Sequence, residues 1–238
     1  MSRRDDVLRE LGLGPIWRLR RPAAESVVAA ASPIPSAASP AAALPAHDRS
    51  ESIAQLAWDD LDAAIRSCTA CALCRARKQA VPGVGDVNAD WLFVGEGPGA
   101  EEDERGEPFV GQAGKLLDAM LAAIDLKRGD NVYIANAVKC RPPGNRTPEP
   151  EETAACWPFL QRQIDLLRPK LIVALGRPAA QTLLQSEIKI SAARGRRFDY
   201  RGIPLVVTYH PAYLLRNLPD KAKAWEDLCF MRRLMEGQ

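Results

Sequence analysis

The stretch WLFVGEGPGAEEDERGEPFVGQAGKLLDAMLAAI, residues 91–124, decides the fold class of this chain. It opens with a short apolar run, passes through a loop of glycine, proline and acidic residues, and ends in an apolar pattern with helical spacing. A short run that is apolar throughout is typical of a strand buried on both faces, as in a parallel sheet. A strand, a polar loop and a helix in that order predict one unit of an α/β fold.

Three further apolar runs repeat this pattern along the chain. They are VYIANAV (132–138), LIVAL (171–175) and PLVVTY (204–209). Helical spacing predicts helices between and after the strands, at residues 113–124, 148–167, 177–184 and roughly 220–235. Strands that alternate with helices predict a three-layer α/β/α sandwich around a central, mostly parallel, four-stranded sheet.

The N-terminal segment differs in composition from the rest. Residues 1–21 (MSRRDDVLRELGLGPIWRLRR) indicate a short amphipathic and basic segment, which we expect to dock onto another protein. Residues 22–50 are mainly alanine, proline and serine, and they bury too little apolar surface to offset their ordering entropy. We therefore expect a disordered linker there, followed by a folded domain at residues 52–238 that opens with a helix capped by Ser52.

Overall composition excludes some classes of protein and leaves others open. The formal net charge is only +2, from 32 basic and 30 acidic residues, so it neither requires nor excludes a nucleic-acid partner. No stretch approaches the roughly 18 uninterrupted apolar residues of a membrane span. Four prolines interrupt the N-terminal alanine-rich tract, which argues against a signal peptide. We expect a monomeric, cytoplasmic protein with no membrane association.

Polar or glycine-rich residues follow each of the four predicted strands. They lie at residues 95–99, 140–146, 176–177 and 210–216. In open α/β sheets, ligands bind beyond the carboxyl ends of the strands, where such loops meet. We therefore predict one binding crevice at this edge of the sheet.

The first of these loops also fits a dinucleotide-binding pattern, Gly95-x-Gly97-x-x-Ala100. Such a site needs a helix N-terminus free of negative charge to hold the pyrophosphate. Here acidic residues 101–104 follow at once, and the next helix is expected only near Ala113. A dinucleotide-dependent oxidoreductase is therefore the weaker interpretation.

Three motifs carry a resemblance to a known family. They are VGEGPGAEEDERGEPFVGQAGKLLD (94–118), NAVKCRPPGNRTP (136–148) and HPAYLLR (210–216). In this order and spacing they resemble the family 4, or iron–sulfur, uracil-DNA glycosylases, from about Cys68 to the C-terminal helix. The resemblance implies a DNA-repair enzyme that hydrolyses uracil out of DNA and leaves an abasic site. A non-catalytic module that binds damaged or single-stranded DNA is the alternative.

Release of uracil requires a flipped base in a pocket and stabilisation of the negative charge that develops on it. Phe109 is the candidate stacking platform, because a Pro-Phe-Val-Gly loop is poor core material. Asn136 can read the uracil edge, since one amide offers a donor for O4 and an acceptor for N3–H. His210, the only histidine beyond residue 50, is expected to donate toward the uracil O2.

The loop after the first strand supplies the rest of the expected pocket. Glu96 and the backbone of Gly97 and Gly99 would line it and position water, and the resemblance implies that Glu102 rejects thymine at the C5 edge. The best-known uracil glycosylases carry a water-activating aspartate where this chain has Gly97, an absence that family 4 shares. We therefore expect a dissociative reaction rather than strong base catalysis.

Four of the six cysteines have the spacing of a metal site, C-x2-C and C-x15-C, at Cys68, Cys71, Cys140 and Cys156. Four thiolates suit either Zn²⁺ or a [4Fe–4S] cluster, and spacing alone does not choose between them. The resemblance implies a [4Fe–4S] cluster with a structural role. Cys74 forms a second C-x2-C pair with Cys71, so its use in place of Cys68 stays open.

DNA contacts are expected from an arginine-rich segment and from the last loop. These arginines are Arg194, Arg196, Arg197, Arg201 and, beside HPAYLL, Arg216. They would hold phosphates without reading sequence, although a solvated charged hairpin explains the first four equally well. A side chain near Tyr213 or Leu214 is expected to wedge into the space that the flipped base leaves.

Overall fold

The computed structural model describes residues 46–237, so the expected docking segment 1–21 and most of the expected linker 22–50 lie outside the described residues. The described chain begins in helix α2 (Ala46–Ala54), and the last residues assigned to the linker are therefore helical. A separate helix, α3 (Trp58–Ser67), follows where the sequence predicts one continuous helix from Ser52. The break is held by Arg162, whose guanidinium donates to the carbonyl of Leu56 at 2.8 Å.

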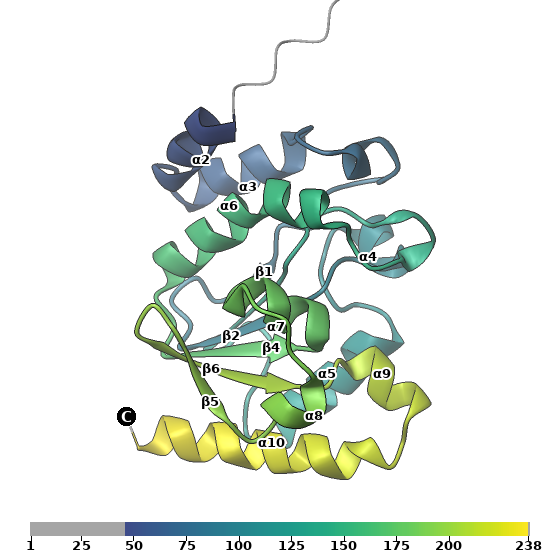
Figure 1. Ribbon diagram of the computed structural model, residues 1–238, viewed down its shortest axis with the longest axis vertical. Helices are drawn as coiled ribbons and strands as arrows, with labels where there is room; N and C mark the ends of the chain where they lie inside the picture. The colour runs from purple at the N-terminus through teal and green to yellow at the C-terminus, as the bar shows by residue number, and fades with distance from the viewer. Residues whose placement is uncertain (1–45, 238) are drawn as a thin grey trace, which may run out of the picture. The chain divides into compact units, whose positions relative to one another are not determined.

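A six-stranded sheet forms the centre of the described chain, in the order β1-β3-β2-β4-β6-β5 (Figure 1). The inner four strands run parallel; they are β3 (Val132–Asn136), β2 (Trp91–Gly95), β4 (Leu171–Leu175) and β6 (Ile203–Thr208). They coincide with the four predicted apolar runs. The α/β class and the mostly parallel sheet are thus confirmed, while the predicted number of strands is too small.

The two additional strands lie at the edges of the sheet. β1 (Val84–Gly85) pairs antiparallel with β3, and β5 (Arg197–Tyr200) pairs antiparallel with β6. Hydrophobic pattern does not detect either strand, because β1 has two residues, and β5 has four, of which Arg197 and Asp199 are charged and exposed. The arginine-rich segment is therefore an edge hairpin, and its turn at Arg201 and Gly202 has the positive φ values that such turns require.

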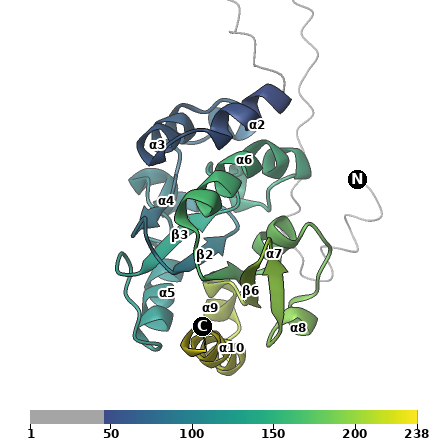
Figure 2. The same cartoon turned by 90° about the vertical axis from the view of Figure 1, so that its left-hand side faces the viewer.

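Helices cover both faces of the sheet, and they form the outer layers of the predicted sandwich (Figures 1 and 2). Their bounds are α5 (Gln112–Ala122), α6 (Pro150–Leu167), α7 (Arg177–Leu184) and α10 (Asp220–Glu236). Leu92 and Val94 of β2 pack with α6 and α7, whereas Trp91 and Phe93 pack with α5 and α10. Helices α2 and α3 lie on the outer side of α6.

Three short helices do not appear in the sequence prediction: α4 (Ala100–Arg105), α8 (Ile190–Ala193) and α9 (Pro211–Arg216). The first corrects the expectation that the helix after the glycine-rich loop begins only near Ala113. Acidic side chains in the first turn favour α4 through the helix dipole, and Glu102 also accepts from the backbone N–H of Gly99 at 3.1 Å. The N-terminus of α4 therefore already holds a carboxylate, which argues against dinucleotide binding there.

Candidate active site

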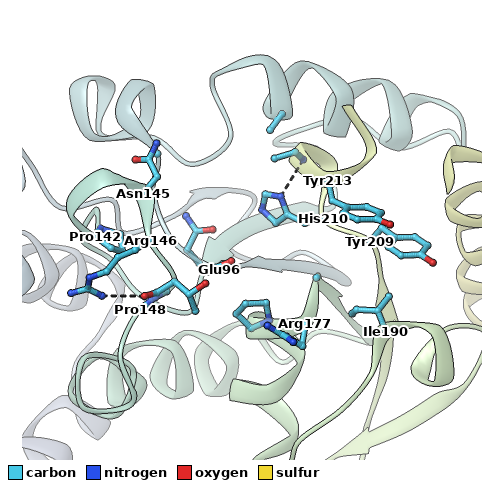
Figure 3. A pocket seen from close by; sticks show the side chains of 18 of the residues that line it. Glu96, Pro142, Asn145, Arg146, Pro148, Arg177, Ile190, Tyr209, His210 and Tyr213 are labelled. Carbon is cyan, nitrogen blue, oxygen red and sulfur yellow. Dashed lines mark hydrogen bonds between the residues drawn. The ribbon is translucent and has the colours of Figure 1, made fainter. Parts of the chain in front are cut away.

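The carboxyl edge of the sheet holds a cavity of about 970 Å³. The loops after β2, β3, β4 and β6 all contribute to its wall, as the strand-end argument predicts. The wall includes all residues expected to bind the base or catalyse its release: Glu96, Gly97, Gly99, Glu102, Phe109, Asn136 and His210. Figure 3 shows Glu96 and Arg146 toward one side of this cavity, Tyr209 and Tyr213 toward the other, and His210 between them.

Phe109 is held at the cavity wall by the backbone around it. Its φ of 56° lies in the left-handed region, which is unfavourable for a bulky side chain. Arg128 stabilises this conformation by donating to the carbonyls of Pro108 at 2.9 Å and of Phe109 at 2.8 Å. The Phe109 ring lies 5.4 Å from the His210 ring between centroids, tilted by 31°. The ring thus packs on the core and also faces the cavity beside the imidazole.

Two glycines make room for this arrangement. A Cβ at Gly95 would lie 2.4 Å from Asn136 Oδ1 and 2.6 Å from Phe109 Cζ. A Cβ at Gly114 would lie 1.8 Å from the Phe109 carbonyl oxygen. No side chain fits at either distance, so glycine is required for Asn136 and Phe109 to approach each other at the end of β2.

Asn136 is the last residue of β3, and its side chain is only 2% exposed. The next two residues donate from their backbone nitrogens to the carbonyls of Gly95 and Glu96, at 2.9 and 3.2 Å. The side-chain oxygen of Asn136 is buried and has no hydrogen-bond partner among the described residues. A buried acceptor without a partner is costly in free energy. Because this side chain lines the cavity, it offers an acceptor to the N–H of a ligand.

His210 uses one ring nitrogen to cap a helix, which leaves the other for the cavity. Its Nδ1 accepts from the backbone N–H of Ala212 at 3.1 Å, at the start of α9. Burial and, to a smaller extent, the positive charge of Arg216 lower the pKa of His210 to about 4, against the opposing charge of Glu102. The imidazole is therefore neutral near pH 7, and its proton is on Nε2 because Nδ1 is the acceptor. Nε2–H is the donor left for a ligand.

Glu102 lies in the cavity wall, but backbone N–H groups occupy its carboxylate. Oε1 accepts from Val110 at 3.0 Å and from Gly111 at 3.2 Å, while Oε2 accepts from Gly99. These bonds clamp the loop after β2 onto the loop that carries Phe109. The contact of Glu102 with the C5 edge of uracil stays a prediction, whereas the clamp is a contact of the described structure.

Glu96 is the carboxyl group beside the bare backbone of Gly97. Burial raises the pKa of Glu96 above its ordinary value, while a hydrogen bond with Thr147 and the charge of Arg177 oppose that shift. Thr147 and Arg177 also line the cavity, and the sequence motifs alone predict no individual role for either side chain. The signal for Arg177 was its position directly after Gly176, at the end of the third predicted strand.

Five cysteines line a second, small cavity beside α6. They are Cys68, Cys71, Cys74, Cys140 and Cys156. The four predicted ligands and the alternative Cys74 therefore come together from segments far apart in the sequence. The apolar side chains of Ile65 and Phe159 complete much of the wall.

Several of these sulfurs accept hydrogen bonds. The donors are Arg77 Nη1 to Cys140 at 2.8 Å, Arg49 Nη2 to Cys68 at 3.6 Å and the Lys139 backbone nitrogen to Cys156 at 3.2 Å. Burial raises the pKa of Cys140 and of Cys156, and these donors and cations oppose that shift by stabilising the thiolates. Within residues 46–237, no three His, Cys, Asp or Glu side chains are grouped so that they would hold one metal ion. The described cysteines thus share a cavity without converging on one point.

Comparison with known proteins identifies the family. The model of the Uracil DNA glycosylase superfamily matches residues 82–229, which include the whole wall of the larger cavity. The chain belongs to this superfamily. The Type-4 uracil-DNA glycosylase of Thermotoga maritima is 49% identical over 161 residues, which are 67% of this chain and 83% of that protein.

Further relatives place this glycosylase-superfamily chain with the type-4 enzymes. The Type-4 uracil-DNA glycosylase of Pyrobaculum aerophilum is 44% identical over 172 residues, which are 69% of this chain and 87% of that protein. A Type-5 uracil-DNA glycosylase of Thermus thermophilus is 36% identical over 159 residues, 52% of this chain and 72% of that protein. The family resemblance predicted from the motifs is confirmed.

The arginines expected to hold DNA have different surroundings in this superfamily member. Arg194 is mostly buried, and its Nε lies 2.8 Å from a carboxylate oxygen of the buried Asp227. Its charge is used inside the fold, so it is unsuited to a phosphate contact and we leave it out of the DNA-binding set. Arg196 and Arg197 are exposed at the β5 edge, outside the cavity wall, whereas Arg216 lines the cavity.

Other cations line the cavity where no DNA contact was predicted: Arg146, Arg177 and Lys189. Arg146 is bound to both carboxylate oxygens of Glu152, at 2.7 and 2.8 Å. Arg177 and Lys189 form no ion pair with another side chain of residues 46–237. Lys189 precedes α8, a helix that hydrophobic pattern does not detect, and its place at the cavity therefore depends on the tertiary fold.

The expected wedge is wrong at Leu214, which is buried in the core. Tyr213 is also engaged: its ring stacks on Tyr209 at 5.1 Å, and its hydroxyl donates to Asp220 at 2.7 Å. The exposed apolar side chains of this stretch are Leu215 and Leu218, which are 40% and 60% exposed. The short helix α9 turns Leu214 inward, and a helix of six residues gives too little hydrophobic periodicity to be predicted.

Proposed function

We propose that this chain hydrolyses the N-glycosidic bond between uracil and deoxyribose in DNA, releasing free uracil and leaving an abasic site. The observation that carries the proposal is the cavity in which an unpaired acceptor of Asn136, a free donor of His210 and the ring of Phe109 line one space. Relatives that share most of their length with this chain are named uracil-DNA glycosylases, which supports the same activity.

Recognition would depend on the amide of Asn136. Its oxygen would accept from the uracil N3–H and its nitrogen would donate to O4, while the ring of Phe109 stacks on the base. Cytosine has an acceptor at N3 and a donor at N4, so it would leave buried polar groups of the amide unpaired. Mismatched polar groups in a buried site support strong discrimination.

Catalysis would depend on the neutral His210. As the bond from N1 to the sugar breaks, its electron pair remains on uracil and the negative charge spreads to O2. The Nε2–H of His210 would donate to O2 and stabilise that charge. Water adds to the sugar carbon, and the proton that it loses neutralises the uracil anion by way of the solvent. Gly97 offers no base for this step, so we propose a dissociative route in which Glu96 positions the water.

We further propose that Cys68, Cys71, Cys140 and Cys156 hold a [4Fe–4S] cluster. The donor set fits this group, because the cysteines surround one cavity and receive hydrogen bonds from Arg49, Arg77 and the backbone of Lys139. A single Zn²⁺ draws all its sulfur ligands to about 2.3 Å, whereas a cluster suits cysteines spread around a cavity. When bound, the cluster would cross-link the segment after α3, the loop after β3 and helix α6.

DNA would lie across the mouth of the larger cavity. Arg177, Lys189 and Arg216 would hold phosphates, because all three line the cavity. Arg196, Arg197 and Arg201 form an outer set on the edge hairpin. Leu215 or Leu218 would enter the space left by the flipped base, as exposed apolar side chains beside Arg216.

The expected setting of the protein extends beyond the described residues. In residues 46–237, no helix has the length and apolar character needed to span a bilayer. A cytoplasmic location, a monomeric state, a linker at residues 22–50 and a docking role for residues 1–21 stay predictions.

Alkali cleavage of an oligonucleotide with a single uracil tests the proposed activity. We expect strand scission at the uracil position after incubation with the protein, and none at a cytosine in the same position. Direct chromatographic detection of free uracil gives a second measurement of the same reaction. Binding to the uracil oligonucleotide without release of uracil would instead support the non-catalytic DNA-binding module.

A further inference from the structure

Lys139 lines the cysteine cavity, three residues after Asn136 in the wall of the larger cavity, and its side chain is only 1% exposed. Its Nζ donates to the backbone carbonyl of Asn136 at 2.9 Å and to Oε1 of Gln163 at 2.6 Å. Its backbone nitrogen donates to the sulfur of Cys156, on the same helix as Gln163. One residue therefore contacts the end of the base-reading strand and the helix that carries a predicted cluster ligand.

Gln163 fixes the outer end of this connection. It is buried, and its Nε2 donates to the carbonyl of Pro82 at 2.9 Å and also lies 3.4 Å from the hydroxyl of Tyr133. Because the amide nitrogen is held by these acceptors, the amide oxygen is held toward Lys139. Helix α6 therefore determines where the ammonium group lies.

The position of the Asn136 backbone determines where its side-chain amide meets the base. The backbone nitrogens of residues 137 and 138 still donate to the carbonyls of Gly95 and Glu96, and the paired strand residues end at Asn136, whose side chain faces the ligand. The bond from Lys139 extends the restraint to the carbonyl of that last residue. A buried ammonium costs much free energy to desolvate. An apolar side chain of similar length would fill the same space but would give Asn136 no hydrogen bond.

We propose that Lys139 is a positioning residue that fixes the backbone of Asn136 and thereby aims the unpaired Oδ1 at the uracil N3–H. The inference rests on the uracil excision proposed above. Without the ammonium, the end of β3 can shift and the amide no longer meets both atoms of the base edge. A displacement of about 1 Å in a positioned group can lower a rate about 10²-fold.

Lys139→Met in the cluster-loaded protein tests this role, with free uracil as the probe. The side chains are similar in length, and only the ammonium is lost. We expect iron and sulfide contents like those of the wild type, and a Kd for free uracil, measured by titration calorimetry, raised about tenfold or more. The single-turnover rate of uracil excision should fall by about 10- to 100-fold. An unchanged Kd would overturn the proposal.

Lys170→Met is the matched control, because Lys170 is exposed and paired with Asp90 just before β2 and β4 begin, at the opposite edge of the sheet from the cavity. It should leave the uracil Kd and the excision rate at the wild-type values. If it weakens uracil binding as much as Lys139→Met does, loss of any lysine charge explains the effect and the positioning role is refuted.

A double-mutant cycle separates positioning from general stability. If Lys139 acts through Asn136, then Lys139→Met should change the excision rate less than twofold when Asn136 is already alanine. The same fold-loss in both backgrounds would refute the proposal. Failure of the wild type to excise uracil would instead refute the proposed function, independently of Lys139.

Gln163→Leu is a second variant in case Lys139→Met loses its cluster or its fold. It removes the acceptor that holds Nζ but retains both Lys139 and Cys156. We expect the uracil Kd to rise in the same direction, by less than in Lys139→Met. A uracil Kd equal to that of the wild type, in a folded and cluster-loaded variant, would overturn the proposal.

Discussion

The two cavities lie on either side of one short segment, residues 136–140, yet their polar groups differ in whether they have hydrogen-bond partners. The larger cavity leaves polar groups unused: an acceptor of Asn136 has no partner, and the Nε2–H of His210 is left free. In the cysteine cavity, the sulfurs of Cys68, Cys140 and Cys156 already receive hydrogen bonds. Polar groups without partners suit the larger cavity to a ligand that binds and dissociates. Hydrogen-bonded sulfurs suit the cysteine cavity to a permanently bound cofactor.

Loss of a cluster ligand should have the largest effect, because the cluster and a hydrogen bond to the shared segment would be lost together. Cys156→Ala should lower the iron content from about four atoms per chain to near zero. The thermal midpoint of unfolding and uracil excision should fall with it, since Lys139 also contacts Cys156. Iron analysis, absorption near 400 nm and calorimetry measure these changes.

Cys74→Ala is the control for that experiment, since Cys74 lines the same cavity but is not among the four proposed ligands. It should retain iron and colour. Full iron content in Cys68→Ala together with loss in Cys74→Ala would show that the C-x2-C pair is Cys71 and Cys74.

Asn136→Asp should lower the rate of uracil excision by about 10⁴-fold without disturbing the cysteine cavity. The shape is kept, but the amide donor for O4 becomes an acceptor. A protonated aspartate would present a donor to cytosine N3, so weak excision of unpaired cytosine is expected as well. Initial rates on matched oligonucleotides with one uracil or one cytosine give the comparison. Undiminished uracil excision would show that another residue reads the base.

His210→Ala should lower the excision rate by about 10²–10³-fold, the usual effect of one oxyanion donor. The iron content should not change, because His210 contacts Ala212 and the Phe109 ring rather than the cysteines. A reduction under tenfold in a folded variant would remove His210 from the catalytic residues.

The sequence predicted the parts of the molecule that depend on local pattern. Continuous apolar runs located all four inner strands, and the polar residues after each strand located the larger cavity. The roles of Phe109, Asn136 and His210 came from the family resemblance together with their chemistry. Their common cavity follows from the parallel sheet, which brings the ends of distant strands to one edge.

The missed features depend on tertiary contacts. Arg194 looks like its neighbours Arg196 and Arg197 in the sequence, and only the fold pairs it with Asp227. Leu214 and Leu215 are adjacent leucines, and the packing of α9 determines that the first is buried and the second exposed. The bond from Lys139 to Asn136 likewise requires α6 to pack beside the end of β3.

A change of pH should have the smallest effect on the excision rate. It tests whether the imidazole of His210 stays neutral in the larger cavity. Burial lowers the pKa of His210 to about 4, below the value of about 6.5 in an unfolded chain. Between these values the unfolded state binds the proton and the folded state does not, so the free energy of unfolding should decrease as the pH falls from 6.5 to 4. Above pH 6.5 the contribution of His210 is constant.

The same pKa predicts that titration of His210 leaves the excision rate unchanged between pH 5 and 8. Glu96 can add an inflection, since burial raises the pKa of its carboxyl, so the wild type is compared with His210→Gln, which does not titrate there. Single-turnover rates should have the same pH profile in both proteins over this range, while the wild type loses more of its thermal midpoint on acidification. An inflection near pH 6.5 in the wild-type rate that is missing from His210→Gln would show that the imidazole is charged at its ordinary pKa. In that case the burial of His210 would not lower the pKa of its imidazole, and the donor in the cavity would not be neutral throughout this pH range.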